Sequence, residues 1–425
     1  MFRAIVIAGA GAWLGALAAC ADSAPPSSAP QAPSVAAGSH ASAAREPAKP
    51  SMSPPASNVA TAADNSKSSA MPAAATAAAA ASPSAEVEVD ADAGVAGDAM
   101  VPEHDAGAAA PACTPNAYVS NSFADSVSVI DTNTHKVVAT IPTGTAPVNP
   151  VFTPDRQKVY VSNSQADTLT VIDVATNRAT MIPAGSHPSG LAFSPDGQTL
   201  YVSLIADFTS PGAVLSIDLG TGQASAPIPM GADPERIALT PDGKHLYVNN
   251  LLDGTMAVVD TESRKVVTTL MLGDLPFNPL LSPDGALVYV GVMSANHIAV
   301  IDTQTNQVVR TIPADSPNGM TYSKGFESLF VSNALSGTVQ QVSLTTNMIL
   351  KTAEVGGVPG NMAVLPDGKH AYMVRPDGST VEILDTSTLE IVDTIEVGMG
   401  PSVVTVCRPA APPVTAMLDA LPHAH

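Results

Sequence analysis

The side chains best suited to chemistry follow prolines that recur along the chain. Glu235 and Arg236 come directly after Pro234, and a carboxylate beside a guanidinium can bind a polar or anionic ligand or polarise an ester. The corresponding positions elsewhere carry neutral polar residues: Asn149, Ser189, Asn278, Asn318, Asn361 and Ser402. If the segments gather around one axis, these side chains form a ring of hydrogen-bonding groups with one charged pair.

Two further residues extend this predicted ligand site. His187 directly precedes a proline of the same series, and Arg375 lies in a loop expected on the same face, where it would join Arg236. The predicted ligand-binding residues are therefore Asn149, His187, Glu235, Arg236, Asn278, Asn318, Asn361 and Arg375. The alternative is a water-filled channel with a local ion pair.

No complete catalytic or metal-binding set accompanies the ring. His187 and His297 belong to different segments, with no cysteine or carboxylate at metal-ligand spacing, and CxxC and CxxCH motifs are absent. The other histidines lie in the terminal tails or in turns expected on the opposite face: His40, His104, His135, His245, His370, His423 and His425. We therefore predict no catalytic residue, no metal and no cofactor.

The elements that position the ring repeat about every 42 residues. In each copy an apolar strand ends in aspartate or its equivalent: Asp131, Asp173, Asp218, Asp260, Asp302, Ser343 and Asp385. Apart from the first, which lacks the Pro-led strand, each copy also contains a Pro-led strand, a turn such as Pro-Asp-Gly and two further strands rich in Val, Ile and Thr, so seven copies predict seven four-stranded blades. The aspartates are expected to accept backbone N–H groups in their own turns.

This repeat resembles the YVTN family of β-propellers. Residues 118–121 (Tyr-Val-Ser-Asn), 128–131 (Ser-Val-Ile-Asp) and 137–142 (Val-Val-Ala-Thr-Ile-Pro) follow the family consensus closely. The resemblance covers residues 113–408 and implies an all-β, seven-bladed β-propeller with four-stranded antiparallel blades. Similar propellers include lactonases and quinone- or haem-dependent oxidoreductases.

The two ends of the repeat region complement each other. The first copy lacks its Pro-led strand, and residues 401–406 (Pro-Ser-Val-Val-Thr-Val) form an extra one at the end. We expect this strand to complete the first blade and close the ring. In that register Cys113 and Cys407 come close enough for a disulfide, which would close a loop of nearly 300 residues and stabilise the fold by a few kcal/mol. Two free buried thiols are the alternative.

The N-terminal region indicates export. Residues 1–19 contain Arg3 and a short apolar run that ends in Leu17-Ala18-Ala19 before Cys20, which resembles a bacterial lipoprotein signal peptide. Cleavage would leave Cys20 lipidated; ordinary secretion, with Cys20 incidental, is the alternative. Residues 20–112 are rich in Ala, Pro and Ser, with acidic residues near the end of the stretch, and this composition predicts a disordered tether. Residues 409–425 are predicted to form a disordered tail.

Charge and composition narrow the function. A net charge of -20 without a basic patch argues against nucleic acid as a partner. We expect a monomer, lipid-anchored in the bacterial cell envelope at the outer membrane, in the periplasm or on the cell surface. Its function would be a non-enzymatic binding or display module whose propeller face binds a partner protein, glycan or small polar ligand. The alternative is a propeller enzyme, such as a lactonase or a quinoprotein or haem-type oxidoreductase relative, although removal of Trp13 with the signal leaves no tryptophan to stack on a cofactor.

Overall fold

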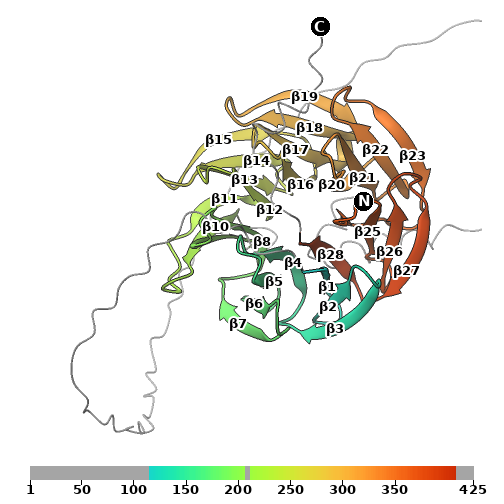
Figure 1. The fold of residues 1–425 in the computed structure, drawn as a ribbon. Coiled ribbons are helices and arrows are strands. Elements are labelled where there is room, and N and C mark those ends of the chain that lie inside the picture. Colours follow the sequence, from blue (N-terminus) through green and yellow to red (C-terminus); the bar gives the residue numbers. More distant parts are fainter. Residues whose placement is uncertain (1–113, 206–210, 408–425) are drawn as a thin grey trace, which may run out of the picture. The chain divides into compact units, whose positions relative to one another are not determined.

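The computed structural model describes residues 114–205 and 211–407, and this part of the chain is built from β-strands (Figure 1). One short 3-10 helix, η1 (Met293–Ala295), is the only helix in these two ranges, so no described helix is long and apolar enough to cross a membrane. The predicted signal peptide, Cys20, the tether, Cys113 and the C-terminal tail lie outside the described residues.

The described strands form seven antiparallel sheets of four strands each. From the inner to the outer strand, the first three blades are β28 (Pro401–Val406), β1 (Asn116–Asn121), β2 (Ser126–Asp131) and β3 (Lys136–Pro142); β4 (Pro147–Phe152), β5 (Lys158–Asn163), β6 (Thr168–Asp173) and β7 (Ala179–Pro183); and β8 (Pro188–Phe193), β9 (Thr199–Leu204), β10 (Pro211–Asp218) and β11 (Ile228–Ala232).

The other four blades follow in chain order. They are β12 (Pro234–Leu239), β13 (His245–Asn250), β14 (Thr255–Asp260) and β15 (Lys265–Met271); β16 (Pro276–Leu281), β17 (Leu287–Val292), β18 (His297–Asp302) and β19 (Gln307–Pro313); β20 (Pro317–Tyr322), β21 (Ser328–Asn333), β22 (Thr338–Ser343) and β23 (Ile349–Glu354); and β24 (Met362–Val364), β25 (His370–Arg375), β26 (Thr380–Asp385) and β27 (Ile391–Glu396). The predicted all-β, seven-bladed propeller is confirmed.

Each blade packs between two neighbours, so its middle strands are buried on both sides. Tyr118 and Val119 are consecutive in β1 and point to opposite faces of the sheet, yet both are fully buried. Tyr118 packs with Val159 of the second blade, whereas Val119 packs with Val374 of the last. Burying one such side chain contributes about 1.5 to 3 kcal/mol, so each interface between blades has its own apolar core.

Ring closure follows the sequence prediction. β28 pairs antiparallel with β1, with Val404 opposite Val119, and this closing strand has the predicted bounds. The last blade therefore shares a core with the first. Cys407 follows β28 directly and is buried, but Cys113 lies outside the described residues, so the disulfide stays a prediction.

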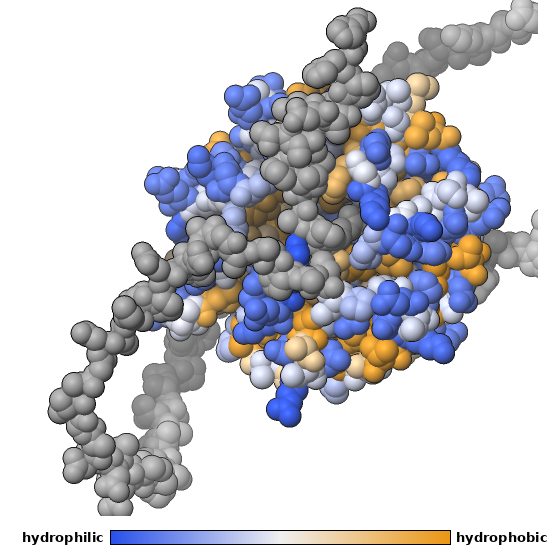
Figure 2. Space-filling model, in the orientation of Figure 1, coloured by the Kyte–Doolittle hydropathy of each residue, from blue (hydrophilic) through white to orange (hydrophobic). Residues whose placement is uncertain are grey.

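Two faces result from this chain path. The mouth face is the one where each inner strand begins; it contains the turns between second and third strands and the connections from each outer strand to the next blade. The turn face, opposite, contains the Asp turns, where Asp131 accepts N–H groups from Asn133 at 2.8 Å and Thr134 at 2.9 Å. On the view drawn in Figure 2, hydrophilic and hydrophobic residues are interspersed around the ring.

Candidate functional site

The side chains at the channel mouth are positioned by a repeated irregularity of the inner strands. In the fourth blade Asp233 has a positive φ of 58° before Pro234, and the pairing of β12 with β13 is interrupted between Pro234 and Ile237. The extra residues of this bulge, Glu235 and Arg236, leave the ladder and face the channel. The same register shift occurs near the start of β4, β8, β16 and β20.

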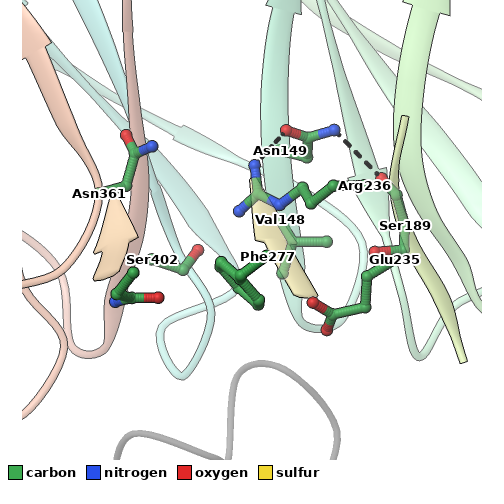
Figure 3. A pocket seen from close by; sticks show the side chains of 9 residues that line it. Val148, Asn149, Ser189, Glu235, Arg236, Phe277, Asn361 and Ser402 are labelled. Atoms are coloured by element: carbon green, nitrogen blue, oxygen red, sulfur yellow. Dashed lines mark hydrogen bonds between the residues drawn. The ribbon is translucent and has the colours of Figure 1, made fainter. Parts of the chain in front are cut away.

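These bulges surround a small pocket at the mouth end of the channel (Figure 3). Its volume is about 30 Å³, which is room for one or two water molecules. Every blade contributes to its lining, which consists of Val148, Asn149, Ser189, Glu235, Arg236, Phe277, Asn318, Asn361 and Ser402. The fold thus brings residues from seven repeats to one point.

Arg236 is held in place from two sides. It donates a hydrogen bond of 2.7 Å to Oδ1 of Asn149, whose amide nitrogen donates to the Ser189 carbonyl at 3.5 Å (Figure 3). Its guanidinium carbon lies 5.7 Å from the centre of the Phe277 ring, in range for a cation–π contact. Burial lowers the pKa of Arg236, with the nearby Glu235 opposing this shift, and the side chain remains a cation.

Glu235 has a different environment. Its residue is 2% exposed, and Oε2 has no hydrogen-bond partner within the described chain. In Figure 3 the carboxyl group points away from the Arg236 guanidinium. Arg236 instead binds Asn149, so the local ion pair considered as an alternative does not form. Burial raises the pKa of Glu235 to about 8, with a further increase from Asp233 and a decrease from Arg236. A carboxyl with this pKa is largely protonated at neutral pH.

Asp233 adds a second buried carboxyl that the sequence reasoning missed. It is buried, its Oδ1 has no hydrogen-bond partner within the described residues, and burial raises its pKa to about 6. The available signal was its position directly before Pro234, where other repeats place Ala146, Leu275 or Ser316. The fourth blade therefore carries two buried carboxyls where its inner strand begins, and one of them, Glu235, lines the pocket.

The comparison with known families agrees with this architecture. The family described as YNCE-like beta-propeller matches residues 91–206. Together with the seven four-stranded blades, this match confirms the resemblance seen in the repeats. The described chain is a seven-bladed β-propeller that is similar to this family. None of the curated proteins matches it significantly.

Several solved structures share the propeller fold. Hydrazine synthase from Kuenenia stuttgartiensis is 21% identical with a TM-score of 0.57, and the match covers 65% of this chain and 93% of that one. A functionally unknown protein from Desulfotomaculum acetoxidans DSM 771 is 17% identical, with a TM-score of 0.60 and coverage of 69% and 99%. Dihydro-heme d1 dehydrogenase NirN, in complex with DHE, is 18% identical, with a TM-score of 0.52 and coverage of 72% and 78%. At these identities the likeness shows the fold alone.

Among the remaining predicted site residues of this propeller, two line the pocket. Asn318 is buried there, and Asn361 accepts the N–H of Val404 through Oδ1 at 3.2 Å. This bond leaves the Asn361 amide nitrogen turned toward the channel (Figure 3). Asn278 does not line the pocket: Phe277 takes that place, and Asn278 adopts a positive φ of 50°, a conformation that asparagine tolerates well.

His187 and Arg375 lie outside the pocket lining. His187 donates its backbone N–H to Oδ1 of Asp167 at 2.9 Å, and its ring lies against Ser186. Arg375 is buried and donates to Glu382 at 2.6 Å and to the carbonyls of residues 355 and 356. Its guanidinium thus binds the connection between β23 and β24 and does not join Arg236.

In the described ranges, no group of three or more His, Cys, Asp or Glu side chains is arranged to hold a metal ion.

Two residues of the lining, Val148 and Phe277, were not predicted from the sequence, because only polar side chains were considered as ligand-binding residues. Both occupy the first position after a repeated proline, which is the signal that would have found them. The site is therefore a ring of mixed polarity around one cation and two buried carboxyls.

Proposed function

We propose that this propeller is a non-enzymatic binding module that holds a partner protein, glycan or small polar ligand at its mouth face. The observation that carries this proposal is the convergence of side chains from all seven blades on one small pocket. Concave sites with a few fixed polar groups are typical binding sites. Arg236 and Asn361 are already held by neighbouring residues, so little conformational entropy is lost when they bind a ligand.

The pocket size limits what enters it. A volume of about 30 Å³ admits the end of a side chain or one small head group, and nothing as large as a cofactor. The remainder of a partner must therefore contact the loops of the mouth face. A macromolecule that inserts one polar group suits this geometry better than a free small molecule.

A matched pair of substitutions tests this function. Asn318→Ala removes an amide that lines the pocket, and Asn133→Ala removes an exposed amide from the turn face. Retention of envelope components by the full-length protein, measured by quantitative cross-linking, should fall several-fold in the first variant and stay unchanged in the second. Equal retention in both, with unchanged melting temperatures, contradicts the proposal.

The cellular setting belongs to the same proposal. Cys20 would carry the lipid anchor, and residues 20–112 would keep the monomeric propeller near the bacterial envelope, free of nucleic acid. Cys20→Ala should move the protein from the membrane fraction to the soluble fraction of its host. If the variant stays in the membrane fraction, another segment is the anchor.

One observation favours a second candidate, a lactonase-like enzyme. A buried carboxyl whose pKa lies near neutrality is a typical general acid or base, and Glu235 is such a group beside a cation. Two similar structures also carry enzyme names, hydrazine synthase and dihydro-heme d1 dehydrogenase, and they support an enzyme at the level of the fold. Replacing both Glu235 and Arg236 by alanine decides the matter: unchanged lactone hydrolysis would sink this candidate.

A further inference from the structure

Exposed carboxylates surround the pocket on the mouth face. They occupy the turns between second and third strands and the connections between blades, and they are Asp125, Asp167, Asp253, Asp274, Asp315 and Asp377. These six residues come from both halves of the ring. Their combined field extends over the pocket entrance.

The basic residues of the described chain are placed elsewhere. The lysines within residues 114–205 and 211–407 all lie on the turn face, at a strand end next to it or in an outer strand: Lys136, Lys158, Lys244, Lys265, Lys324, Lys351 and Lys369. On the mouth face, within the described ranges, the two arginines are Arg236 in the channel and Arg375, which forms an ion pair with Glu382 at 2.5 Å. The mouth face is therefore strongly acidic.

Local structure explains only some of these acids. Asp125 accepts the N–H of Ala146 at 2.9 Å, and Asp253 accepts that of Ala232 at 2.7 Å, so these side chains fix the connections between blades. For Asp274 and Asp315 the described structure shows no such bond to the backbone. Their charge contributes to the field without an evident role in the fold.

The pocket at the centre of this face offers an acceptor. Oε2 of Glu235 lies among the pocket residues and has no hydrogen-bond partner in the described chain, and Asp233 brings a second buried oxygen in the same state two residues away. Arg236 opposes a cation here, but its guanidinium is bound to Asn149 and packed against Phe277. The six exposed carboxylates around the pocket outweigh this single positive charge, and a cation bound beside Glu235 would favour the ionised form of its carboxyl.

Apolar side chains stand between the exposed carboxylates. Phe123, Leu252, Met271, Leu335 and Met399 are all exposed on the mouth face. Phe123 and Met399 are neighbours where the closing strand β28 joins β1, and the Phe123 N–H donates to the Met399 carbonyl at 3.1 Å. Aromatic and methionine side chains are enriched in protein interfaces.

We propose that the mouth face docks a basic polypeptide segment that inserts a lysine ammonium group into the pocket beside Glu235. This inference rests on the proposed binding function and adds the chemistry of the partner. An ammonium group is about the size of a water molecule and fits the pocket, whereas a planar guanidinium is larger. Apolar residues of the segment would contact Phe123, Met399 and the other exposed apolar side chains.

Two labelled peptides and the full-length protein test the proposal by fluorescence anisotropy. The probe is a short peptide of alternating lysine and leucine, and its control alternates glutamate and leucine. We expect the lysine peptide alone to bind, and Glu235→Gln to weaken it. Equal binding of the glutamate peptide would overturn the proposal, because contact would then be apolar only.

A charge-matched pair of double variants locates the docking face. Asp274→Asn with Asp315→Asn neutralises two exposed acids of the mouth face, and Glu262→Gln with Glu390→Gln neutralises two exposed acids of the turn face. The first pair should weaken the lysine peptide about five- to tenfold, and the second should leave it unchanged. Equal losses in both pairs would show attraction to net charge only and contradict the proposal.

The outcomes separate this inference from the function beneath it. If envelope components depend on Asn318 but the lysine peptide fails to bind, the binding function stands and the cationic partner is wrong. If Asn318→Ala has no effect on retention and the lysine peptide also fails to bind, both proposals fail.

Discussion

The two faces of this propeller use carboxylates in opposite ways. On the turn face, hydrogen bonds from Ser387 and Thr388 lower the pKa of Asp385 to about 2, so the folded structure favours the charged form. At the mouth, burial raises the pKa values of Asp233 and Glu235, so the folded structure disfavours the charged form. The first arrangement stabilises the fold and the second costs stability.

This difference indicates where the molecule does something other than fold. An Asp turn supplies its own N–H donors within three residues, which any repeat can do, and even Ser343 accepts the Thr346 N–H in the same way. A buried carboxyl without a donor is unfavourable unless a ligand pairs with it. The mouth of the fourth blade is therefore the place to test.

The largest expected effect is the pH dependence of stability caused by Glu235. Its pKa is about 8 in the folded chain against 4.5 for the unperturbed group, so its contribution is fully present below about pH 4.5 and is lost as the pH rises through 8. The loss should amount to about 3 to 5 kcal/mol. Urea unfolding between pH 5 and 9, at roughly one-unit steps, should show a free energy of unfolding that falls with pH for the wild type and falls less for Glu235→Gln. A wild-type curve that rises over this range contradicts the assignment.

The next effect concerns ring closure, which involves a hydrogen bond between serines at the mouth face and a predicted disulfide at the turn face. At the mouth, the hydroxyls of Ser122 and Ser402 lie 3.0 Å apart, while Cys407 follows the same strand at the turn face. If Cys407 pairs with Cys113 as predicted, Cys407→Ser should cost about 2 to 4 kcal/mol under oxidising conditions. Under reducing conditions, wild type and variant should unfold alike in thermal melts. Equal stability without reductant would mean that no disulfide forms.

A smaller effect is expected from the Asp turns. Asp385→Asn should weaken bonds to Ser387 and Thr388 and cost about 1 kcal/mol near neutral pH. The contribution of Asp385 is present above the unperturbed pKa of 3.8 and is lost as the pH falls toward 2, opposite in sign to that of Glu235. Glu390→Gln in the same turn is the control. If Asp385→Asn is as stable as this control, the turn aspartates do not stabilise the fold.

The smallest effect on stability is expected at the exposed methionines. Met271 on the mouth face is 77% exposed and Met348 on the turn face is 66% exposed. Replacing either by serine should change the free energy of unfolding by less than about 0.5 kcal/mol. Met271→Ser should nevertheless weaken the lysine and leucine peptide roughly two- to threefold, and Met348→Ser should not. Equal peptide binding by both variants would remove the apolar part of the proposed interface.

Much of the architecture could be predicted from local signals. The Asp-ended strands gave the blade count, and the orphan segment 401–406 gave the closing strand with its observed bounds. The pocket was predicted less completely. Asn318 and Asn361 line it, whereas Arg375 forms an ion pair with Glu382 outside it. Phe277 lines the pocket in place of Asn278, because a bulge in β16 directs these two neighbouring side chains differently.

By itself the sequence determined the β class, the seven repeats and the order in which they close, because strand periodicity and Pro, Asp and Gly turns are properties of short segments. Only the tertiary structure decided that Arg236 binds Asn149, 87 residues away, and that Glu235 is buried without a partner. It also decided that the lysines of the described chain lie away from the mouth face, where six exposed aspartates surround the pocket. Burial and electrostatic fields depend on neighbours brought together by ring closure, which no single repeat contains.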